Sequence, residues 1–567
     1  MRFESPRIPL FRRAGAWPPS PTRAGTLRYN RKVRAFLRVV AAVAVVCCFA
    51  ACARPTTRHG LLRIVNISEP DSLDPVVGNF QIDSDLAQLW GGMLFNWSDR
   101  DEFVPELATA VPTTANGGIS RDGTTIVYHL RPGVTWQDGA PFTAADVIWT
   151  WRAVMNPKNN VPSTVGYDLI RSIDAPDAHT IVVHLRRPFA PFIATFFAPS
   201  SNPYPVLPKH LLARYADINQ VPFNSQPVGT GPFTMEKWQR GSKIVFRANP
   251  HYWRGRPKLD EIWYTPVPDE NTTVTLLKTH EADVEYNAAS KNYPQLAHVD
   301  GFRTILTPFT QYGQLALNLR TPALADVRVR RALWLALDVP ELITDVTHGV
   351  DTLGHTDQPE FLWAYNPRAT HYAYAPAKAR ALLDAAGWHV GRDGIRTKNG
   401  VRLSLVLAGI AGSADGNAVN VLVQRAWHDA GVELIPKLYT SSLFFESFGA
   451  GGVVQTGKFD VAFFSWLNGP DPDDSVNWMC DQFPPRGQNV YHYCNPELDR
   501  QERIALTSYD RPTRKRAYDE IQRLLADDVP AIIPLYHRRI SVVSEALRNY
   551  RPAHAVSSFW NCYEWEI

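Results

Sequence analysis

The chain has 567 residues, and 59 Lys and Arg against 55 Asp and Glu give it a net charge of +4. Residues 1–52 contain ten of the basic residues and a single acid, so the remainder carries a net charge of −5. This mildly acidic remainder argues against a protein that binds the phosphate backbone of nucleic acids. The composition, with 45% hydrophobic and 20% charged residues, excludes the disordered and fibrous classes.

The N-terminal segment is typical of an export signal. Basic residues at 31–38 precede an uncharged run at 39–51, VVAAVAVVCCFAA, which is shorter than the roughly 20 residues of a membrane span. We therefore expect residues 1–52 to be an export signal of the lipoprotein type. The end of this run, FAAC, resembles a bacterial lipobox, which implies lipid on Cys52 and anchoring to a membrane. Residues 1–32 do not look like part of a signal, and we hypothesise that translation starts near Val33.

Three cysteines lie beyond the signal and Cys52. In an oxidising compartment the close pair Cys480 and Cys494 is a candidate disulfide, with free buried thiols as the alternative. A bond over this short loop would stabilise by roughly 3 kcal/mol and would leave Cys562 without a partner.

The first half of the chain predicts an α+β region. Segments 122–132 and 177–188 both alternate apolar and polar residues, which predicts two half-buried strands of one antiparallel sheet. His129 and His184 fall on the polar faces of these strands, so we expect surface residues and not a metal pair. Residues 144–155 form an amphipathic pattern that predicts a helix capped by Thr143.

The second half predicts alternating strands and helices. Apolar strand patterns at 402–409, 432–439 and 459–466 are separated by helical patterns, and Gly431 occupies the position of a helix C-terminal glycine. This order indicates βαβ units and a largely parallel sheet. A further helix is expected at 513–528, before the apolar strand at 529–537.

Catalytic and metal-binding motifs are missing. The sequence contains no G-x-S-x-G, S-x-x-K, H-E-x-x-H, C-x-x-C or G-x-G-x-x-G pattern, and its 16 histidines show no i,i+4 pairing. Residues 452–459 resemble a P-loop, but Phe459 replaces the hydroxyl residue that would hold Mg²⁺. We expect no catalytic residues, no metal and no cofactor.

Trp466 is the strongest candidate for a ligand-binding residue. It ends the predicted strand at 459–466 and precedes an acidic, proline-containing loop. The carboxyl ends of strands are where α/β sheets present their ligand groups. We therefore expect Trp466 to line a binding site, against the alternative of a core tryptophan.

Ten stretches in order resemble the extracellular solute-binding proteins of family 5, the dipeptide and oligopeptide receptors of ABC importers. The matching stretches are 69–75 (EPDSLDP), 105–110, 122–151, 207–212 (LPKHLL), 227–238 (PVGTGPFTMEKW), 248–262, 317–338, 379–388 (ARALLDAAGW), 495–499 and 528–537 (DVPAIIPLYH).

The resemblance implies an α/β fold of the class II periplasmic-binding type, in which two crossings join two lobes. Residues 62–308 and 537–567 would form the first lobe, with an extra antiparallel subdomain at about 89–224, and residues 309–536 would form the second lobe. It also implies closure of the lobes around a solute. Closure depends on contacts that the ligand makes better in the closed state.

The same resemblance implies particular site residues. Peptide-binding members hold the ligand ammonium with an aspartate three residues after the tryptophan, but this chain has Gly469 there. Either Asp471 takes this role, with a solvent-facing turn as the alternative for that residue, or the ligand is not a free-amino peptide. We also expect Asn468 in the wall of the site, Gly78 and Asn79 in the loop after the first strand, and Tyr491 at the rim.

The implied function is that of an extracytoplasmic, monomeric receptor, which captures a peptide or peptide-like solute and delivers it to the permease and ATPase of an ABC importer. Three alternatives remain. The first is a receptor for a glycan, a metal chelate or haem, the second is a sensor or adaptor on the same fold, and the third is an extracytoplasmic enzyme.

Overall fold

The computed structural model describes residues 60–555 and 558–567. The expected signal, the start near Val33 and the lipidation of Cys52 lie outside the described residues. No helix within the described residues is long and apolar enough to cross a membrane.

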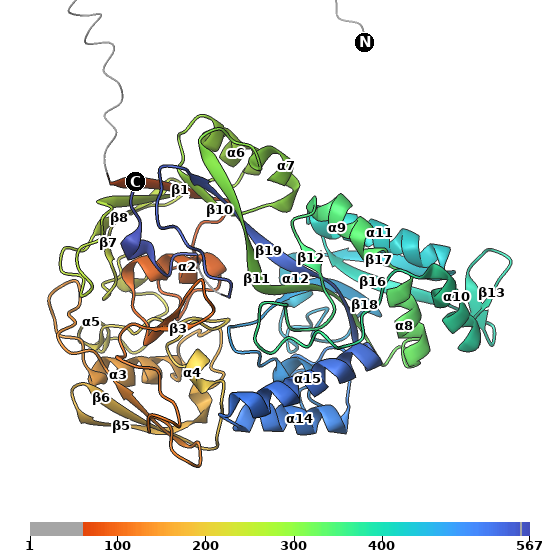
Figure 1. Cartoon of the computed structure of the whole chain (residues 1–567), viewed down its shortest axis with the longest axis horizontal. Coiled ribbons are helices and arrows are strands. Elements are labelled where there is room, and N and C mark those ends of the chain that lie inside the picture. The colour runs from red at the N-terminus through yellow and green to blue at the C-terminus, as the bar shows by residue number, and fades with distance from the viewer. Residues whose placement is uncertain (1–59, 556–557) are drawn as a thin grey trace, which may run out of the picture. The chain divides into compact units, whose positions relative to one another are not determined.

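A mixed sheet of eleven strands runs through the described chain (Figure 1). Ten strands form one path, and β12 (Thr352–Leu353) pairs separately with β19. The ten are, in order, β17 (Glu433–Tyr439), β16 (Ser404–Ile410), β18 (Val461–Leu467), β11 (Phe302–Leu317), β19 (Ala531–Ser544), β10 (Val284–Ala288), β1 (Leu61–Asn66), β9 (Glu261–Pro266), β8 (Lys243–Ala248) and β7 (Phe233–Gln239).

The two long strands β11 and β19 connect the two lobes. The two ends of each strand contribute to different cores: Val542 is buried in one core with the partly buried Leu306 packed against it, and Leu315 and Ile532 are buried in another. The division that we predicted at 308/309 and 536/537 falls inside these two strands.

The expectation of a largely parallel second-lobe sheet is only partly correct. Strand β16 is parallel to both β17 and β18, as the βαβ pattern predicts. Strands β11 and β19, however, are antiparallel to each other, and β11 is antiparallel to β18. The chain enters the second lobe through β11 and returns through β19, and two neighbouring crossings of this kind must run in opposite directions.

The second lobe is built on helices that bury their apolar faces. Gly431 has a φ of +87° directly after α11, which confirms the predicted helix end before β17. Helices α14 and α15 lie side by side (Figure 1). The helices are α8 (Val327–Leu335), α9 (Val339–Thr347), α10 (Pro376–Ala385), α11 (Ala414–Asp429), α12 (Ser441–Phe445), α13 (Ser475–Trp478), α14 (Pro496–Thr507) and α15 (Arg511–Asp528). A small sheet contains β13 (His389–Val390), β14 (Arg396–Lys398) and β15 (Val401–Arg402).

The expected antiparallel pair is confirmed in a separate sheet of the first lobe. Its order is β4 (Thr125–His129), β6 (Thr180–Leu185) and β5 (Ile170–Asp177), and Ile126 pairs with Val183. His129 is exposed, and His184 is partly exposed and contacts Asp174, so both lie at the surface as expected.

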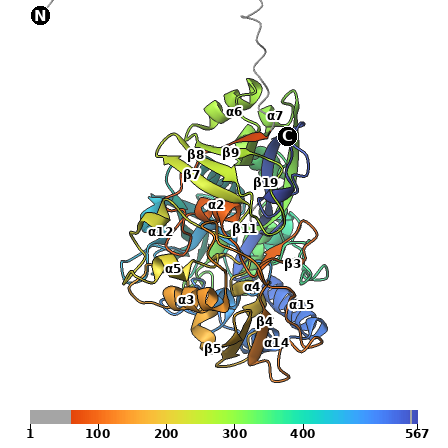
Figure 2. The same cartoon turned by 90° about the vertical axis from the view of Figure 1, so that its left-hand side faces the viewer.

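Helix α3 (Ala144–Val154) packs beside this small sheet, at the opposite end of the view from β7–β9 (Figure 2). It begins after Thr143 as predicted, and the Thr143 N–H donates to the Asp146 carboxylate at 2.9 Å. The other elements of the first lobe are α2 (Gln81–Trp90), β2 (Phe95–Trp97), β3 (Phe103–Pro105), α4 (Phe192–Thr195), α5 (Lys209–Leu212), α6 (Glu270–Lys278) and α7 (Tyr293–Leu296).

Candidate functional site

A cavity of about 360 Å³ lies at the carboxyl end of β18. Its lining comes from two segments of the chain, 162–204 and 466–488, which we name the neutral wall and the charged wall. Among the described residues, the neutral wall contributes no charged side chain to the lining. The polar and aromatic residues of the neutral wall that line the cavity are Ser163, Tyr167, Phe189, Thr195, Ser200, Ser201, Asn202 and Tyr204.

Trp466 lines this cavity from the carboxyl end of β18, one residue before the strand ends. It is half-buried and pairs across the sheet with Tyr312 of β11. The aromatic ring is therefore held by a strand and not by a mobile loop, which suits a rigid contact surface.

Asn468 is the first residue of the cleft loop, which we define as residues 468–474. Its backbone N–H donates to the Thr310 carbonyl at 3.0 Å, and the Thr310 hydroxyl donates to the Asn468 carbonyl at 2.6 Å. The side-chain amide donates to the Asp357 carbonyl at 3.3 Å. Asn468 is 3% exposed, so it fixes the start of the loop more than it offers free groups to a ligand.

Gly469 of the cleft loop lies close to the neutral wall. A Cβ atom at this position would lie 3.4 Å from Ser200 Cα and 3.4 Å from Ser201 N. A methyl group at this position would therefore be in van der Waals contact with the backbone of the neutral wall.

Asp471 is already paired with a base. Arg514 of α15 donates to both of its carboxylate oxygens, at 2.8 and 2.6 Å, and both side chains are largely buried. Burial alone would lower the pKa of Arg514, but the adjacent Asp471 carboxylate raises it above its ordinary value. Asp471 is thus neither a solvent-facing turn residue nor a free acceptor for a ligand ammonium in this structure.

The next two acids of the loop are not neutralised in this way. Asp473 lines the cavity and accepts from the Ser475 N–H at 3.1 Å, and no basic side chain in the described part of the chain pairs with it. Burial, with a further contribution from Asp471, raises the pKa of Asp473. Asp474 also lines the cavity, is 1% exposed, and accepts from the Trp478 indole at 2.9 Å.

Three predicted site residues do not line this cavity. Gly78 is buried against Asp83, and Asn79 is exposed and donates to Asp71 at 3.1 Å. Tyr491 is not a rim residue: it is 1% exposed, stacks on Trp478 with a centroid distance of 4.5 Å, and donates to Gln314 at 2.8 Å. The aromatic and apolar neighbours of Tyr491 place it in the second-lobe core.

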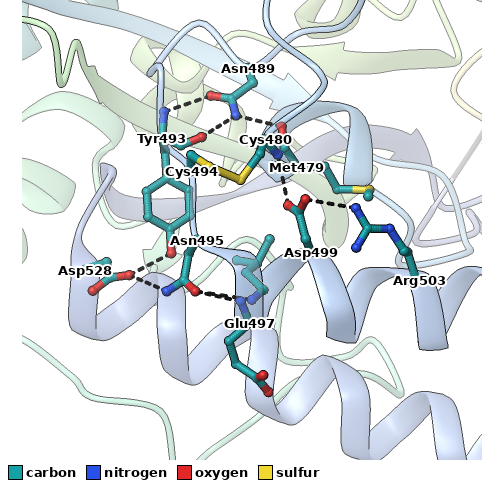
Figure 3. Close-up of a disulfide and its surroundings, with 11 residues drawn as sticks. Met479, Cys480, Asn489, Tyr493, Cys494, Asn495, Glu497, Asp499, Arg503 and Asp528 are labelled. Carbon is teal, nitrogen blue, oxygen red and sulfur yellow. Dashed lines mark hydrogen bonds and ion pairs between the residues drawn. A yellow bond between two sulfur atoms is a disulfide. The ribbon is translucent and has the colours of Figure 1, made fainter.

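A disulfide joins Cys480 and Cys494 with a Cα–Cα distance of 4.5 Å (Figure 3). Asn489 donates to the carbonyls of Met479 and Tyr493, at 3.0 and 2.7 Å, from inside the loop that the disulfide closes. The same loop presents residues 486–488 to the cavity, so the disulfide limits the motion of part of the charged wall. Cys562 is a buried free thiol, as expected because an odd number of cysteines follows Cys52.

The neutral wall is the part of the site that sequence reasoning missed. The sequence feature that marks this wall is a run of small and polar residues at 198–203, APSSNP, shortly after the buried helix α4. Among residues 60–555 and 558–567, no group of three or more His, Cys, Asp or Glu side chains has an arrangement that could hold a metal ion.

Comparison with known proteins identifies the family. Residues 102–485 match the family described as bacterial extracellular solute-binding proteins, family 5 Middle. Protein XP55 of Streptomyces lividans is 29% identical over 529 residues, which cover 88% of this chain and 90% of that protein. The oligopeptide-binding protein AppA of Bacillus subtilis is 24% identical over 513 residues, which cover 89% of this chain and 91% of AppA.

The fold is shared with solved members of this group. NikA of Brucella suis, solved in complex with Fe(III)-EDTA, superposes with a TM-score of 0.77 at 22% identity and covers 89% of this chain and 99% of its own. The match to the family model spans more than half of the residues. The chain therefore belongs to family 5 of the bacterial extracellular solute-binding proteins.

Proposed function

We propose that this protein captures a peptide or peptide-like solute between the neutral and charged walls and delivers it to the permease and ATPase of an ABC importer. The observation that carries this proposal is that two cavities adjoin between these walls. The Trp466 cavity shares Val165, Phe189, Asp473, Val476 and Arg486 with a second cavity of about 630 Å³. Two adjoining cavities suit an extended solute with several polar groups along its length.

The chemistry of the lining supports the same class of solute. Hydroxyl and amide groups of Ser163, Asn202 and Gln488 can bond the amides of a peptide backbone, while Trp466 and Tyr204 offer apolar contact. The family membership and the name of the AppA relative agree with peptide capture. On this proposal the protein acts as a monomer outside the cytoplasm, held at the membrane by lipid on Cys52.

A second candidate is a non-peptide solute of the kind that NikA holds, a metal chelate. Gly469 at the position of the family's ammonium-binding aspartate, together with the neutralised Asp471, favours this candidate. It predicts a ligand that makes no ammonium contact beside Trp466.

Native mass spectrometry of residues 53–567, produced in an oxidising compartment, tests both candidates. A ladder of released masses that fits short peptides supports peptide capture. A single discrete non-peptide mass supports the second candidate and contradicts the first. The Trp466→Ala variant serves as the site control, and it should release less ligand than the parent protein.

A further inference from the structure

A serine, a histidine and an aspartate form one hydrogen-bonded chain on the sheet that joins the two lobes. Ser465 Oγ lies 2.8 Å from His537 Nε2, and His537 Nδ1 lies 2.9 Å from Asp351 Oδ2. The serine and the aspartate are 72 and 186 positions away from the histidine in the sequence, so no local motif predicts their contact. We name these three residues the serine triad.

Asp351 reaches His537 across one pair of strands. Strand β12 is antiparallel to β19, and Thr352 lies opposite Tyr536, so the residue before Thr352 lies beside the residue after Tyr536. The backbone also holds the carboxylate, because Asp351 Oδ1 accepts from the Arg538 N–H at 3.0 Å. Asp351 is therefore fixed by two donors, one from the backbone and one from the imidazole.

Ser465 reaches His537 over a glycine. Strand β11 lies between β18 and β19 (Figure 1), and its Gly313 pairs with Ser465 on one side and with Leu535 on the other. Paired residues of antiparallel strands point to the same face, as do residues two apart in one strand, so Ser465 and His537 share a face. A Cβ atom at 313 would lie 2.8 Å from Leu535 Cδ1 and 3.6 Å from His537 Nε2. Glycine therefore keeps the space between the hydroxyl and the imidazole free.

The order of the contacts sets the protonation of the imidazole. A carboxylate has no hydrogen to donate, so Nδ1 of His537 carries the proton and donates it to Asp351. Nε2 is then free to accept the hydrogen of the Ser465 hydroxyl. In this arrangement a histidine can act as the base of a serine nucleophile while a carboxylate fixes its tautomer. Such sites are recognised by geometry and not by the order of the residues in the chain.

The nucleophile and the base are accessible, and the aspartate is shielded. The His537 side chain is 26% exposed and Ser465 is partly exposed, whereas the Asp351 side chain is 4% exposed. Consecutive residues of a strand point to opposite faces of the sheet, so the Ser465 hydroxyl lies on the other face from the Trp466 ring. The serine triad is thus separate from the Trp466 cavity.

A second contact of a hydroxyl, a histidine and an aspartate, in the first lobe, provides an internal comparison. Thr125 Oγ1 lies 3.3 Å from His184 Nδ1, and His184 Nε2 lies 3.1 Å from Asp174 Oδ2. The hydroxyl contact is longer than that of Ser465, and the Asp174 side chain is 68% exposed. Water competes for an exposed carboxylate, so Asp174 holds its histidine less firmly than Asp351 does.

We propose that Ser465 is a nucleophile that accepts an acyl group from activated esters, with His537 as its base and Asp351 as a positioning residue. The serine Oγ attacks the ester carbonyl carbon while its proton passes to His537 Nε2. The ester C–O bond breaks, the leaving oxygen takes the proton from Nε2, and the acyl group remains on the serine. Attack of water by the same proton transfers releases the acid and restores the hydroxyl. This inference goes beyond solute capture and does not rest on it.

Covalent labelling tests the proposal. The purified protein is treated with p-nitrophenyl acetate and, separately, with diisopropyl fluorophosphate, from which the serine oxygen displaces fluoride while the proton leaves as HF. Intact mass counts the adducts, and peptide mass spectrometry places them. We expect one phosphoryl adduct per chain on Ser465, and acetylation of the same residue with release of p-nitrophenolate. A parent protein without an adduct at Ser465, or one labelled at Thr125 in preference, would overturn the proposal.

Matched variants show whether the histidine activates the serine. Ser465→Ala should abolish the adduct, and His537→Gln should slow its formation at least about 100-fold, the contribution expected of a general base. His184→Gln, which changes the comparison contact in the first lobe, should leave the labelling rate unchanged. Equal rates in His537→Gln and His184→Gln would overturn the proposal. Thermal unfolding confirms that each variant folds, and Ser465→Ala, which removes a single hydroxyl group, keeps the test decisive if His537→Gln does not.

Asp351→Asn tests the positioning role. The introduced amide can donate to Nδ1, so the imidazole proton should move to Nε2, and labelling of Ser465 should slow at least about tenfold. The ¹⁵N spectrum of the His537 ring reports which nitrogen carries the proton, and a loss of stability alone would not move it. An unchanged tautomer together with an unchanged labelling rate would overturn the role of Asp351.

Discussion

The two walls of the cavity differ in charge although they have similar polarity. In the Trp466 cavity the neutral wall, residues 162–204, offers hydroxyl, amide and aromatic groups, and the charged lining residues within the described chain come from the charged wall, residues 466–488. The adjoining cavity differs, because Asp168 and Arg187 of residues 162–204 line it. The charged wall is also the one cross-linked by a disulfide and supported by Arg514. In the Trp466 cavity the charge therefore lies on one wall, whereas the other wall presents hydroxyl, amide and aromatic groups.

The largest expected effect comes from breaking the support of the charged wall. Arg514→Met leaves Asp471 as an unpaired, largely buried carboxylate, which should lower the free energy of unfolding by about 3–5 kcal/mol. Urea denaturation measures the loss. Arg500→Met, which removes the exposed partner of Glu497 on α14, should cost no more than about 1 kcal/mol.

A double variant sharpens this test. Because the penalty comes from the uncompensated charge, Asp471→Asn combined with Arg514→Met should recover much of the lost stability. If Arg514→Met costs no more than Arg500→Met, the Asp471 carboxylate does not depend on this ion pair.

The next largest effect concerns the disulfide of the charged wall. Cys480 and Cys494 are 14 residues apart, and the loss of a cross-link over such a loop should cost roughly 3 kcal/mol. The Cys480→Ser/Cys494→Ser variant and the reduced parent protein should show the same decrease in urea midpoint. A parent protein whose midpoint does not change under reducing conditions would contradict the expected contribution of the bond.

Much of the fold was predictable because the relevant signals are local. The alternation at 122–132 and 177–188, the cap at Thr143 and the glycine at 431 each act within a few residues, and the structure places β4, β6, α3 and the start of β17 there. The antiparallel direction of β11 and β19 was missed, because strand direction depends on how the chain crosses between lobes and not on periodicity.

Of the candidate site, the sequence predicted the residue that lies at the end of a strand. Trp466 follows from the carboxyl end of β18, but the partner of Asp471 is 43 residues away on α15, and nothing in the sequence around Asp471 indicates it. Asp357, Asp474 and Glu502 are likewise buried although they come from three separate segments. Such tertiary contacts explain why the aspartate that we favoured from sequence is neutralised while its neighbours are not.

A smaller effect is expected where Tyr509 of the second lobe contacts the neutral wall. Tyr509, between α14 and α15, donates to the carbonyls of Phe189 and Gly123, at 3.0 and 3.2 Å. Tyr509→Phe keeps the ring and removes these bonds, so the unfolding free energy should fall by about 1 kcal/mol in chemical denaturation. Tyr374→Phe is the control, because the exposed Tyr374 hydroxyl makes no hydrogen bond within the described residues. Equal stability of the two variants would mean that the Tyr509 hydroxyl does not help to hold the neutral wall against the second lobe.

The smallest effect is expected at Gly469, where the walls meet. An added methyl group would lie at 3.4 Å from Ser200 Cα and Ser201 N, which is ordinary contact, and the φ angle of Gly469 is not in the left-handed region. Gly469→Ala should therefore change the unfolding free energy by less than about 0.5 kcal/mol. Gly449→Ala, where a methyl group would have no neighbour within 4 Å, provides the baseline in the same urea titration. A loss well above that baseline would mean that the two walls approach more closely than this distance, and that glycine is required at 469 for the walls to meet at all.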